Sequence, residues 1–125
     1  MIRNFEHETK PLSIDEQDAA KALATLFNKN PNMRFTEPIL SKALAREKNL
    51  NIKGSRFRKV INYIRMNSLV INLLADNRGY YKSNEPRRIK AYIKSLDDRI
   101  DAIKAVRDSF IIPNPEEKID SSKLF

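Results

Sequence analysis

Several residue types that build catalytic and metal sites are scarce in this sequence of 125 residues. It contains no cysteine and no tryptophan, one histidine (His7) and two glycines, Gly54 and Gly79. These counts exclude disulfides and thiolate ligands, and they leave no histidine cluster for zinc and no glycine-rich phosphate loop. No apolar run approaches the roughly 20 residues of a membrane span, and the N-terminus lacks the apolar region of a signal peptide. We therefore expect a soluble intracellular protein without a cofactor or metal.

Positive charge, by contrast, is abundant and unevenly distributed. The chain has a formal net charge of +8. The segment 48–94 holds twelve lysines and arginines but only two acids, so it carries +10 and the rest of the chain −2. A generally basic, solvated surface would spread its charge evenly. The segregation instead predicts a polyanionic partner, with DNA or RNA favoured over a membrane surface.

Local signals predict two helices in the first half of the chain. Residues 1–12 are expected to form a flexible N-terminal arm. Ser13 and Glu16 have the spacing of a capping box and open the first helix. The run 33–35 is long enough for only a small strand or a pinned loop, and Thr36 then caps a second helix.

The second half of the chain predicts a helix, a hairpin and a long helix. Leu50 and Ile52 should point toward the core just before a third helix, which spans about 54–67. Two β-favouring runs within 70–82 surround a four-residue Asp/Asn/Gly connection and indicate a hairpin. A fourth helix, with apolar residues at intervals of three and four, is expected over 84–112.

This order of elements resembles the winged helix-turn-helix, in particular the DNA-binding domain of the biotin repressor and of many small phage and plasmid proteins. The resemblance covers about residues 14–82. It is carried by FTEPILSKALA (35–45), KGSRFRKVINYIR (53–65) and NRGYYKS (77–83), which would be the first helix of the motif, the recognition helix and the wing. The connection between the two helices, residues 48–53, is longer than the turn of the simplest members.

The resemblance implies a mostly α fold with a small β-hairpin wing, followed by a long C-terminal helix. A winged helix domain would occupy residues 13–83 and bind double-stranded DNA. The helix 84–112 would serve packing or dimerisation. Residues 113–125 are expected to form a flexible tail, whose last three residues have the look of a docking peptide for a protein partner.

The apolar stripe of the fourth helix, residues 89–110, extends past the surface that a winged helix core can cover. An exposed stripe of this kind needs a partner. We expect a homodimer through this helix, which would place two recognition helices on neighbouring turns of the groove. The alternative is that the helix folds back on the first helix.

A helical wheel of the third helix separates its apolar and polar residues. Phe57, Val60, Ile61 and Ile64 fall within about a quarter of the circumference and should face the core. Arginine and lysine can donate to guanine, and asparagine can pair with adenine, in a groove that admits a helix. Five side chains are therefore predicted to point into the major groove: Ser55, Arg56, Lys59, Asn62 and Tyr63. Two more are predicted to lie nearer the phosphates: Lys53 and Arg58. The alternative is a solvated polar face.

Three further arginines are candidate DNA contacts. Arg78 lies at the tip of the hairpin, and arginine is favoured in narrow, electronegative minor grooves. Its neighbours Asn77 and Gly79 are expected only to make the turn. Arg87 and Arg88 crowd the start of the fourth helix, where cations do not favour the helix itself. They would contact phosphate or form a solvated face.

These features predict a DNA-binding protein, most simply a dimeric transcriptional regulator of a phage or mobile element in the cytoplasm of a bacterial host cell. One alternative is a replication or packaging accessory that binds DNA with little sequence choice. Another is a winged helix used to hold a protein. We expect no enzyme, because the acidic cluster Asp97, Asp98 and Asp101 is interleaved with basic residues at ion-pairing spacing.

Overall fold

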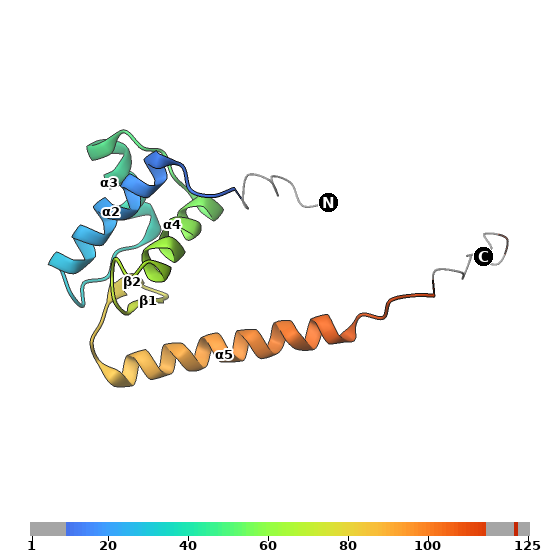
Figure 1. The fold of residues 1–125 in the computed structure, drawn as a ribbon. Coiled ribbons are helices and arrows are strands. Elements are labelled where there is room, and N and C mark those ends of the chain that lie inside the picture. The colour runs from blue at the N-terminus through green and yellow to red at the C-terminus, as the bar shows by residue number, and fades with distance from the viewer. Residues whose placement is uncertain (1–9, 115–121, 123–125) are drawn as a thin grey trace. The chain divides into compact units, whose positions relative to one another are not determined.

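The computed structural model describes residues 10–114 and Ser122 (Figure 1). These residues fall into two units, one ending at Tyr92 and the other beginning at Ile93. The elements in chain order are α2 (Ile14–Lys29), α3 (Glu37–Lys48), α4 (Gly54–Met66), β1 (Leu73–Asp76), β2 (Gly79–Lys82) and α5 (Pro86–Ser109). The described part of the chain is thus mostly helical with one small antiparallel sheet and a long C-terminal helix, as predicted. None of its helices is long and apolar enough to cross a membrane.

Two predicted segments fall largely outside this part of the chain. Residues 1–9 of the expected arm are not among those described, and neither are 115–121 and 123–125 of the expected tail. The proposed docking peptide, Lys123-Leu124-Phe125, therefore lies outside the described residues, as does His7.

Helix α2 begins with the predicted capping box. The Glu16 backbone N–H donates to Ser13 Oγ at 3.1 Å, and the Ser13 N–H donates to Glu16 Oε1 at 3.0 Å. Its buried face consists of Ala19, Ala20, Leu23, Ala24 and Phe27. The small alanines near the start of α2 allow the helix to approach α4 closely. Phe27, near its end, is fully buried in the core.

The connection between α3 and α4 is fixed at several points. Asn49 ends α3 in the left-handed conformation, which asparagine tolerates better than most residues. Ser41, buried in α3, donates its hydroxyl to the Ile52 carbonyl at 3.1 Å. Ile52 is buried and Leu50 packs partly buried against the core, which confirms the predicted inward direction of both. The longer connection is therefore a packed segment with a fixed path.

Helix α4 contributes four large apolar side chains to the core. Phe57, Val60, Ile61 and Ile64 are buried, as the helical wheel predicts. They pack in one cluster with residues of α2 and α3, including Phe27 and Leu40. Because each has an exposed fraction of at most 1%, the orientation of α4 about its own axis is set by apolar burial.

The hairpin is shorter than the sequence predicts. β1 and β2 pair antiparallel from Leu73↔Lys82 to Asp76↔Gly79, so that a two-residue turn joins them. The expected strand began at Val70, but β1 starts only at Leu73. Asn72, within the expected run, has a positive φ of 61°, and such a residue interrupts an extended strand.

Phe35 extends this small sheet. It forms an isolated antiparallel bridge with Tyr80, and each backbone N–H donates to the other residue's carbonyl at 2.9 Å. The Phe35 ring also packs edge-on against Phe27, at 5.8 Å between ring centroids. The short segment before α3 is thus tied both to the hairpin and to the core.

Candidate nucleic-acid interface

The polar face of α4 carries hydrogen-bonding groups suited to bases and phosphates. Arg58 and Asn62 are exposed on successive turns of this face, and Lys53 is exposed just before it. Ser55 is half-buried. The Arg58 side chain makes no hydrogen bond or ion pair within the described residues. These positions agree with the predicted outer face. On the flank of α4 that holds Arg56 and Tyr63, the exposure predicted from the wheel is less accurate.

The N-terminus of α4 differs from those of α2 and α3. The other two helices begin with a side-chain cap, Ser13 or Thr36, and each has an acid in its first turn. At α4 the N-cap residue is Lys53, no side chain caps the helix, and its first turn has no acid. Uncapped backbone N–H groups and the helix dipole both favour an anion, so this end suits a phosphate.

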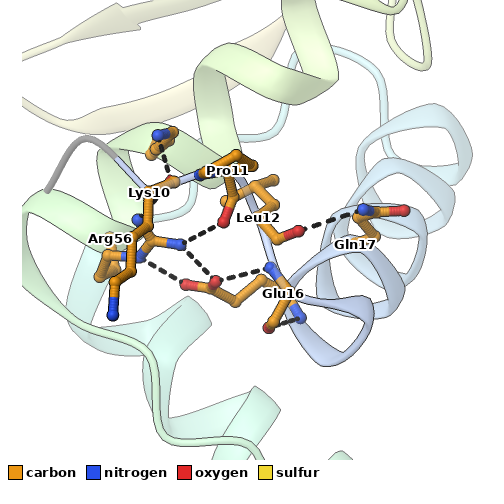
Figure 2. A network of polar contacts seen from close by, with 8 residues as sticks. Lys10, Pro11, Leu12, Glu16, Gln17 and Arg56 are labelled. Carbon is orange, nitrogen blue, oxygen red and sulfur yellow. Dashed lines mark hydrogen bonds and ion pairs between the residues drawn. The ribbon is translucent and has the colours of Figure 1, made fainter. Parts of the chain in front are cut away.

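The prediction that Arg56 projects from the exposed face is wrong. Arg56 is only 7% exposed, and its guanidinium lies between α2 and the segment that precedes it (Figure 2). Nε donates to Glu16 Oε2 at 2.8 Å and Nη2 to Glu16 Oε1 at 2.5 Å. Nη1 and Nη2 also donate to the carbonyls of Lys10 and Pro11, at 2.8 and 3.2 Å. Arg56, a residue of α4, therefore binds the segment formed by Lys10 and Pro11 to that helix.

The ion pair changes the acidity of Glu16. The hydrogen bond from Arg56 lowers the Glu16 pKa from 4.5 to about 2, against the opposing effect of burial. The same bond raises the pKa of Arg56 above its ordinary value. Glu16 thus serves both as the capping residue of α2 and as the counter-ion of a buried arginine. A buried pair of this kind needs its additional hydrogen bonds to offset desolvation.

Hydrogen bonds from α2 and α4 consequently fix residues 10–12 in place, although these residues were expected to belong to a flexible arm. Besides Arg56, the Lys59 ammonium donates to the Lys10 carbonyl, and Gln17 donates to the Leu12 carbonyl at 3.2 Å. Lys59 itself is half-buried. Its predicted contact with a base therefore competes with a bond to the backbone of this segment.

Tyr63, predicted to face the groove, is half-buried and packs against the hydrophobic core. It lies on the same flank of α4 as Arg56. On this flank, therefore, the rest of the protein covers more of α4 than the apolar quarter of its circumference that the wheel identifies. The exposed face is correspondingly narrower and is centred on Arg58 and Asn62.

Arg65, which the sequence did not single out, supports this face from the other flank. Its guanidinium donates to the Leu73 carbonyl at 2.9 Å, to Asn62 Oδ1 at 3.3 Å and to the Tyr92 hydroxyl at 3.0 Å. It thereby links α4 to β1 and to the first turns of α5. The i, i+3 spacing on one helix could have indicated the bond to Asn62. No sequence signal identifies Leu73 and Tyr92 as partners, since only the fold brings them to Arg65.

At the hairpin tip Arg78 is exposed, as predicted. Its backbone N–H donates to Asp76 Oδ1 at 2.9 Å, which shapes the turn, while Arg34 pairs with Asp76 Oδ2 at 2.8 Å. Burial would raise the Asp76 pKa, but the bonds from Arg78 and Arg34 outweigh it and lower that pKa. Asp76 is therefore ionised and bonded to both arginines. These bonds hold the turn at which the exposed Arg78 side chain lies.

Arg87 and Arg88 differ in their surroundings. Arg87 is exposed at the start of α5. Arg88 pairs with Glu85 at 2.9 Å and lies 5.9 Å from the ring centroid of Tyr81. Arg34 lies over the same ring at 4.1 Å. Arg88 is thus partly committed to the protein, whereas Arg87 is open to a phosphate.

The described residues contain no group of three or more His, Asp or Glu side chains that could hold a metal ion. Comparisons of the chain with protein-family models, with curated proteins and with solved structures find no match. The candidate interface therefore rests on the geometry and charge of this chain alone.

Proposed function

We propose that this chain is a winged helix protein that binds double-stranded DNA, with α4 as the recognition helix. The observation that carries the proposal is the outer face of α4, where Arg58 and Asn62 are exposed on a helix whose N-terminus has no side-chain cap and no acid in its first turn. The bridge between Phe35 and Tyr80 supports the winged helix assignment. The bridge makes Phe35 the short strand that the resemblance expects between the first two helices.

In this proposal the α4 residues have different roles. Asn62 reads a base, because its amide can pair bidentately with adenine while Arg65 holds Oδ1 in place. Arg58 and Lys53 contact phosphates, and Ser55 contacts a base or phosphate near the helix start. Lys59 takes part only by exchanging its bond with the Lys10 carbonyl. Arg56 acts as a positioning residue and does not touch DNA.

The remaining arginines belong to the periphery of the interface. Arg78 extends from the wing toward the minor groove or the adjacent backbone, and Arg87 contacts phosphate. Arg88 contributes less, because it already pairs with Glu85. Together with the basic segment 48–94, these residues provide the electrostatic attraction that precedes base reading.

We further propose that the protein acts as a homodimer through residues 89–110, as a transcriptional regulator of a phage or mobile element in the bacterial cytoplasm. The exposed apolar residues of α5 support self-association. The alternative functions are non-specific DNA binding in replication or packaging, and protein binding by the same domain. Apart from Met66, the exposed side chains of the α4 face are polar. This favours DNA over a protein partner, since protein interfaces have apolar centres.

The test is a titration against random duplexes and against duplexes selected from a random pool. Sequence reading predicts a gap in affinity between the two, and Asn62→Ala should reduce that gap by roughly 1–3 kcal/mol. Arg58→Ala is the matched variant, since it should weaken both classes of duplex equally.

Equal loss on all sequences with Asn62→Ala would support the non-specific alternative and end the base-reading claim. Failure to bind any duplex at low salt would overturn both DNA functions. For the dimer, a sedimentation mass that remains monomeric at high concentration would contradict the proposal.

A further inference from the structure

The second unit carries an apolar stripe whose spacing is that of a coiled-coil seam. Its members are exposed and follow one another along one helix face: Ile93, Leu96, Ile100, Ile103 and Phe110. The exposed fraction rises from 39% at Leu96 to 68% at Ile103. Arg107 occupies the one seam position within this stretch that is not apolar. α5 has no buried residue, so none of the described residues of this unit covers the face.

Charged residues flank the seam and restrict how two copies can pair. Asp97 and Lys104 lie along one edge of the stripe, in equivalent positions of successive seven-residue repeats. Arg99 lies along the other edge. In a parallel pair, opposite edges of the two helices meet, whereas in an antiparallel pair each edge meets its own counterpart.

A parallel pair brings like charges together. Arg99 of each copy would face Lys104 of the other, and the twofold symmetry would create this repulsion twice. The two Arg107 side chains would in addition meet each other within the seam. Like charges at such short range oppose pairing.

An antiparallel pair can remove these conflicts. When Ile100 of one copy packs against Ile103 of the other, Ile93 comes opposite Phe110 and all four are covered. Arg107 then meets Leu96, so its apolar stem packs while its charged end reaches the edge of the seam. In this register every seam residue has a partner from the other copy, and the two Arg107 side chains do not meet.

In the same register the edge charges become complementary. Asp97 of one copy lies beside Lys104 of the other, and close to its Arg107, with the same contacts repeated by symmetry. Moving the register by one seven-residue repeat in either direction brings Asp97 against Asp97, or Lys104 against Lys104. Charge therefore selects a single antiparallel register.

We propose that α5 pairs with α5 of a second copy in this antiparallel register, with Ile100 packed against Ile103. The inference rests on the self-association proposed above and not on the DNA contacts. It adds that the two helices run in opposite directions, so the N-terminal ends of the two α5 helices lie at opposite ends of the seam.

Disulfide trapping in the full-length protein tests the direction. Because the chain has no cysteine, each variant carries one thiol. Leu96→Cys and Arg107→Cys are prepared separately, equilibrated alone and as a mixture in a glutathione buffer, and analysed by mass without reduction. The antiparallel pair predicts the mixed Leu96–Arg107 disulfide. Residues 96 and 96 of the two copies are then about 16 Å apart, beyond disulfide reach.

Each outcome decides a different claim. Predominance of the mixed disulfide supports the antiparallel pair. Predominance of disulfides between identical variants shows a parallel dimer and overturns the inference while keeping the proposed dimer. Absence of all of them, with a monomeric mass for the unmodified protein, overturns both, and DNA titration of the unmodified protein still tests the DNA contacts separately.

A charge variant provides an independent measurement. Lys104→Asp should raise the dimer dissociation constant roughly 5- to 20-fold if the pair is antiparallel, because two attractive contacts become repulsive. In a parallel pair the same variant would face Arg99 and tighten the dimer. Lys94→Asp makes the same charge change outside the seam and serves as the control, since Lys94 pairs with Asp98 of its own helix at 3.2 Å.

Discussion

Arg56 shows how one residue can belong to the polar pattern of a sequence and to the interior of the fold. On a wheel of α4 it stands among the exposed polar residues, yet it is buried against Glu16 and two backbone carbonyls. A wheel shows only how the residues of one helix are distributed around its axis. It contains no information about the acid that α2 places beside that flank.

The first prediction concerns this pair. Arg56→Ala removes one partner of a buried ion pair and leaves Glu16 without compensation, so we expect a loss of about 3–5 kcal/mol in the free energy of unfolding. Arg58 lies two residues further along α4 and is exposed. Arg58→Ala should therefore change the free energy of unfolding by less than about 0.5 kcal/mol. Urea unfolding of both variants measures the difference. Equal stabilities would show that the Arg56 contacts contribute nothing.

The pKa of Glu16 leads to a second prediction. Since the folded-state pKa is about 2 and the ordinary value 4.5, ionised Glu16 stabilises the fold above about pH 4.5, and this contribution is lost as the pH falls toward 2. Its size is on the order of 3 kcal/mol. Glu16→Gln should therefore be less stable than the unmodified protein at pH 7 and lose less stability on acidification.

Unfolding measured in urea at several pH values between about 7 and 2 provides this comparison. Other carboxylates titrate in both proteins, so only the difference between the two curves reports Glu16. Curves that stay parallel over the whole range would contradict a shifted Glu16 pKa.

At the scale of elements, Gly79 is the residue on which the hairpin depends most. It has a φ of 127°, and a Cβ atom there would lie 2.4 Å from the Phe35 carbonyl oxygen. The close approach is the same one that forms the bridge between Phe35 and Tyr80. The glycine thus allows the segment before α3 to pack on the hairpin.

The third prediction follows from this contact. Gly79→Ala combines backbone strain with a collision against a backbone atom, which cannot move aside as a flexible side chain can. We expect a loss of about 2–4 kcal/mol in the free energy of unfolding. Asn77→Ala at the exposed turn is the control and should cost less than about 1 kcal/mol. Similar thermal unfolding of the two variants would argue against the tight contact at Gly79.

The sequence predicts elements well where their signals are local. The capping box at Ser13, the apolar spacing of α4 and the inward direction of Ile52 depend on neighbouring residues, and all three are confirmed. The predicted start of β1 is too early, because the left-handed residue Asn72 interrupts a run of β-favouring side chains. Local composition does not reveal such a backbone conformation.

The candidate site is predicted less completely, since it depends on contacts between distant residues. Arg58, Asn62 and Arg78 are exposed where the sequence places them. Arg56 and Tyr63 are not, because the cover on their flank comes from α2 and from the core. The bond of Arg65 to Tyr92 joins residues 27 positions apart, and its bond to Leu73 reaches from α4 to β1. Only the fold brings those partners together.

For the whole molecule, the uneven charge and the two units suggest a division of tasks. The basic segment 48–94 contains the proposed recognition helix, the wing and the start of α5. The exposed apolar stripe lies in the second unit, from Ile93 onward. In the proposed function the first unit binds DNA, and the second joins two copies of the chain.

This division leads to a fourth prediction. Replacing Ile100 and Ile103 with lysine removes two central apolar residues of the seam and adds repulsion between copies. We expect a monomeric sedimentation mass together with unchanged unfolding of the first unit. Affinity for a single half-site should be retained, whereas affinity for a two-fold site should fall because simultaneous binding by linked copies is lost. A stable dimer of this variant would show that another surface joins the copies.

The claim that the outer face of α4 meets DNA is tested most directly by the salt dependence of binding. The slope of log K against log salt is measured on one duplex for the unmodified protein, for Arg58→Ala and for Lys21→Ala, which removes an exposed lysine of α2. Loss of one phosphate contact should make the slope shallower by about 0.9 for Arg58→Ala and leave it unchanged for Lys21→Ala. Identical slopes for Arg58→Ala and the unmodified protein would contradict the proposed role of this face.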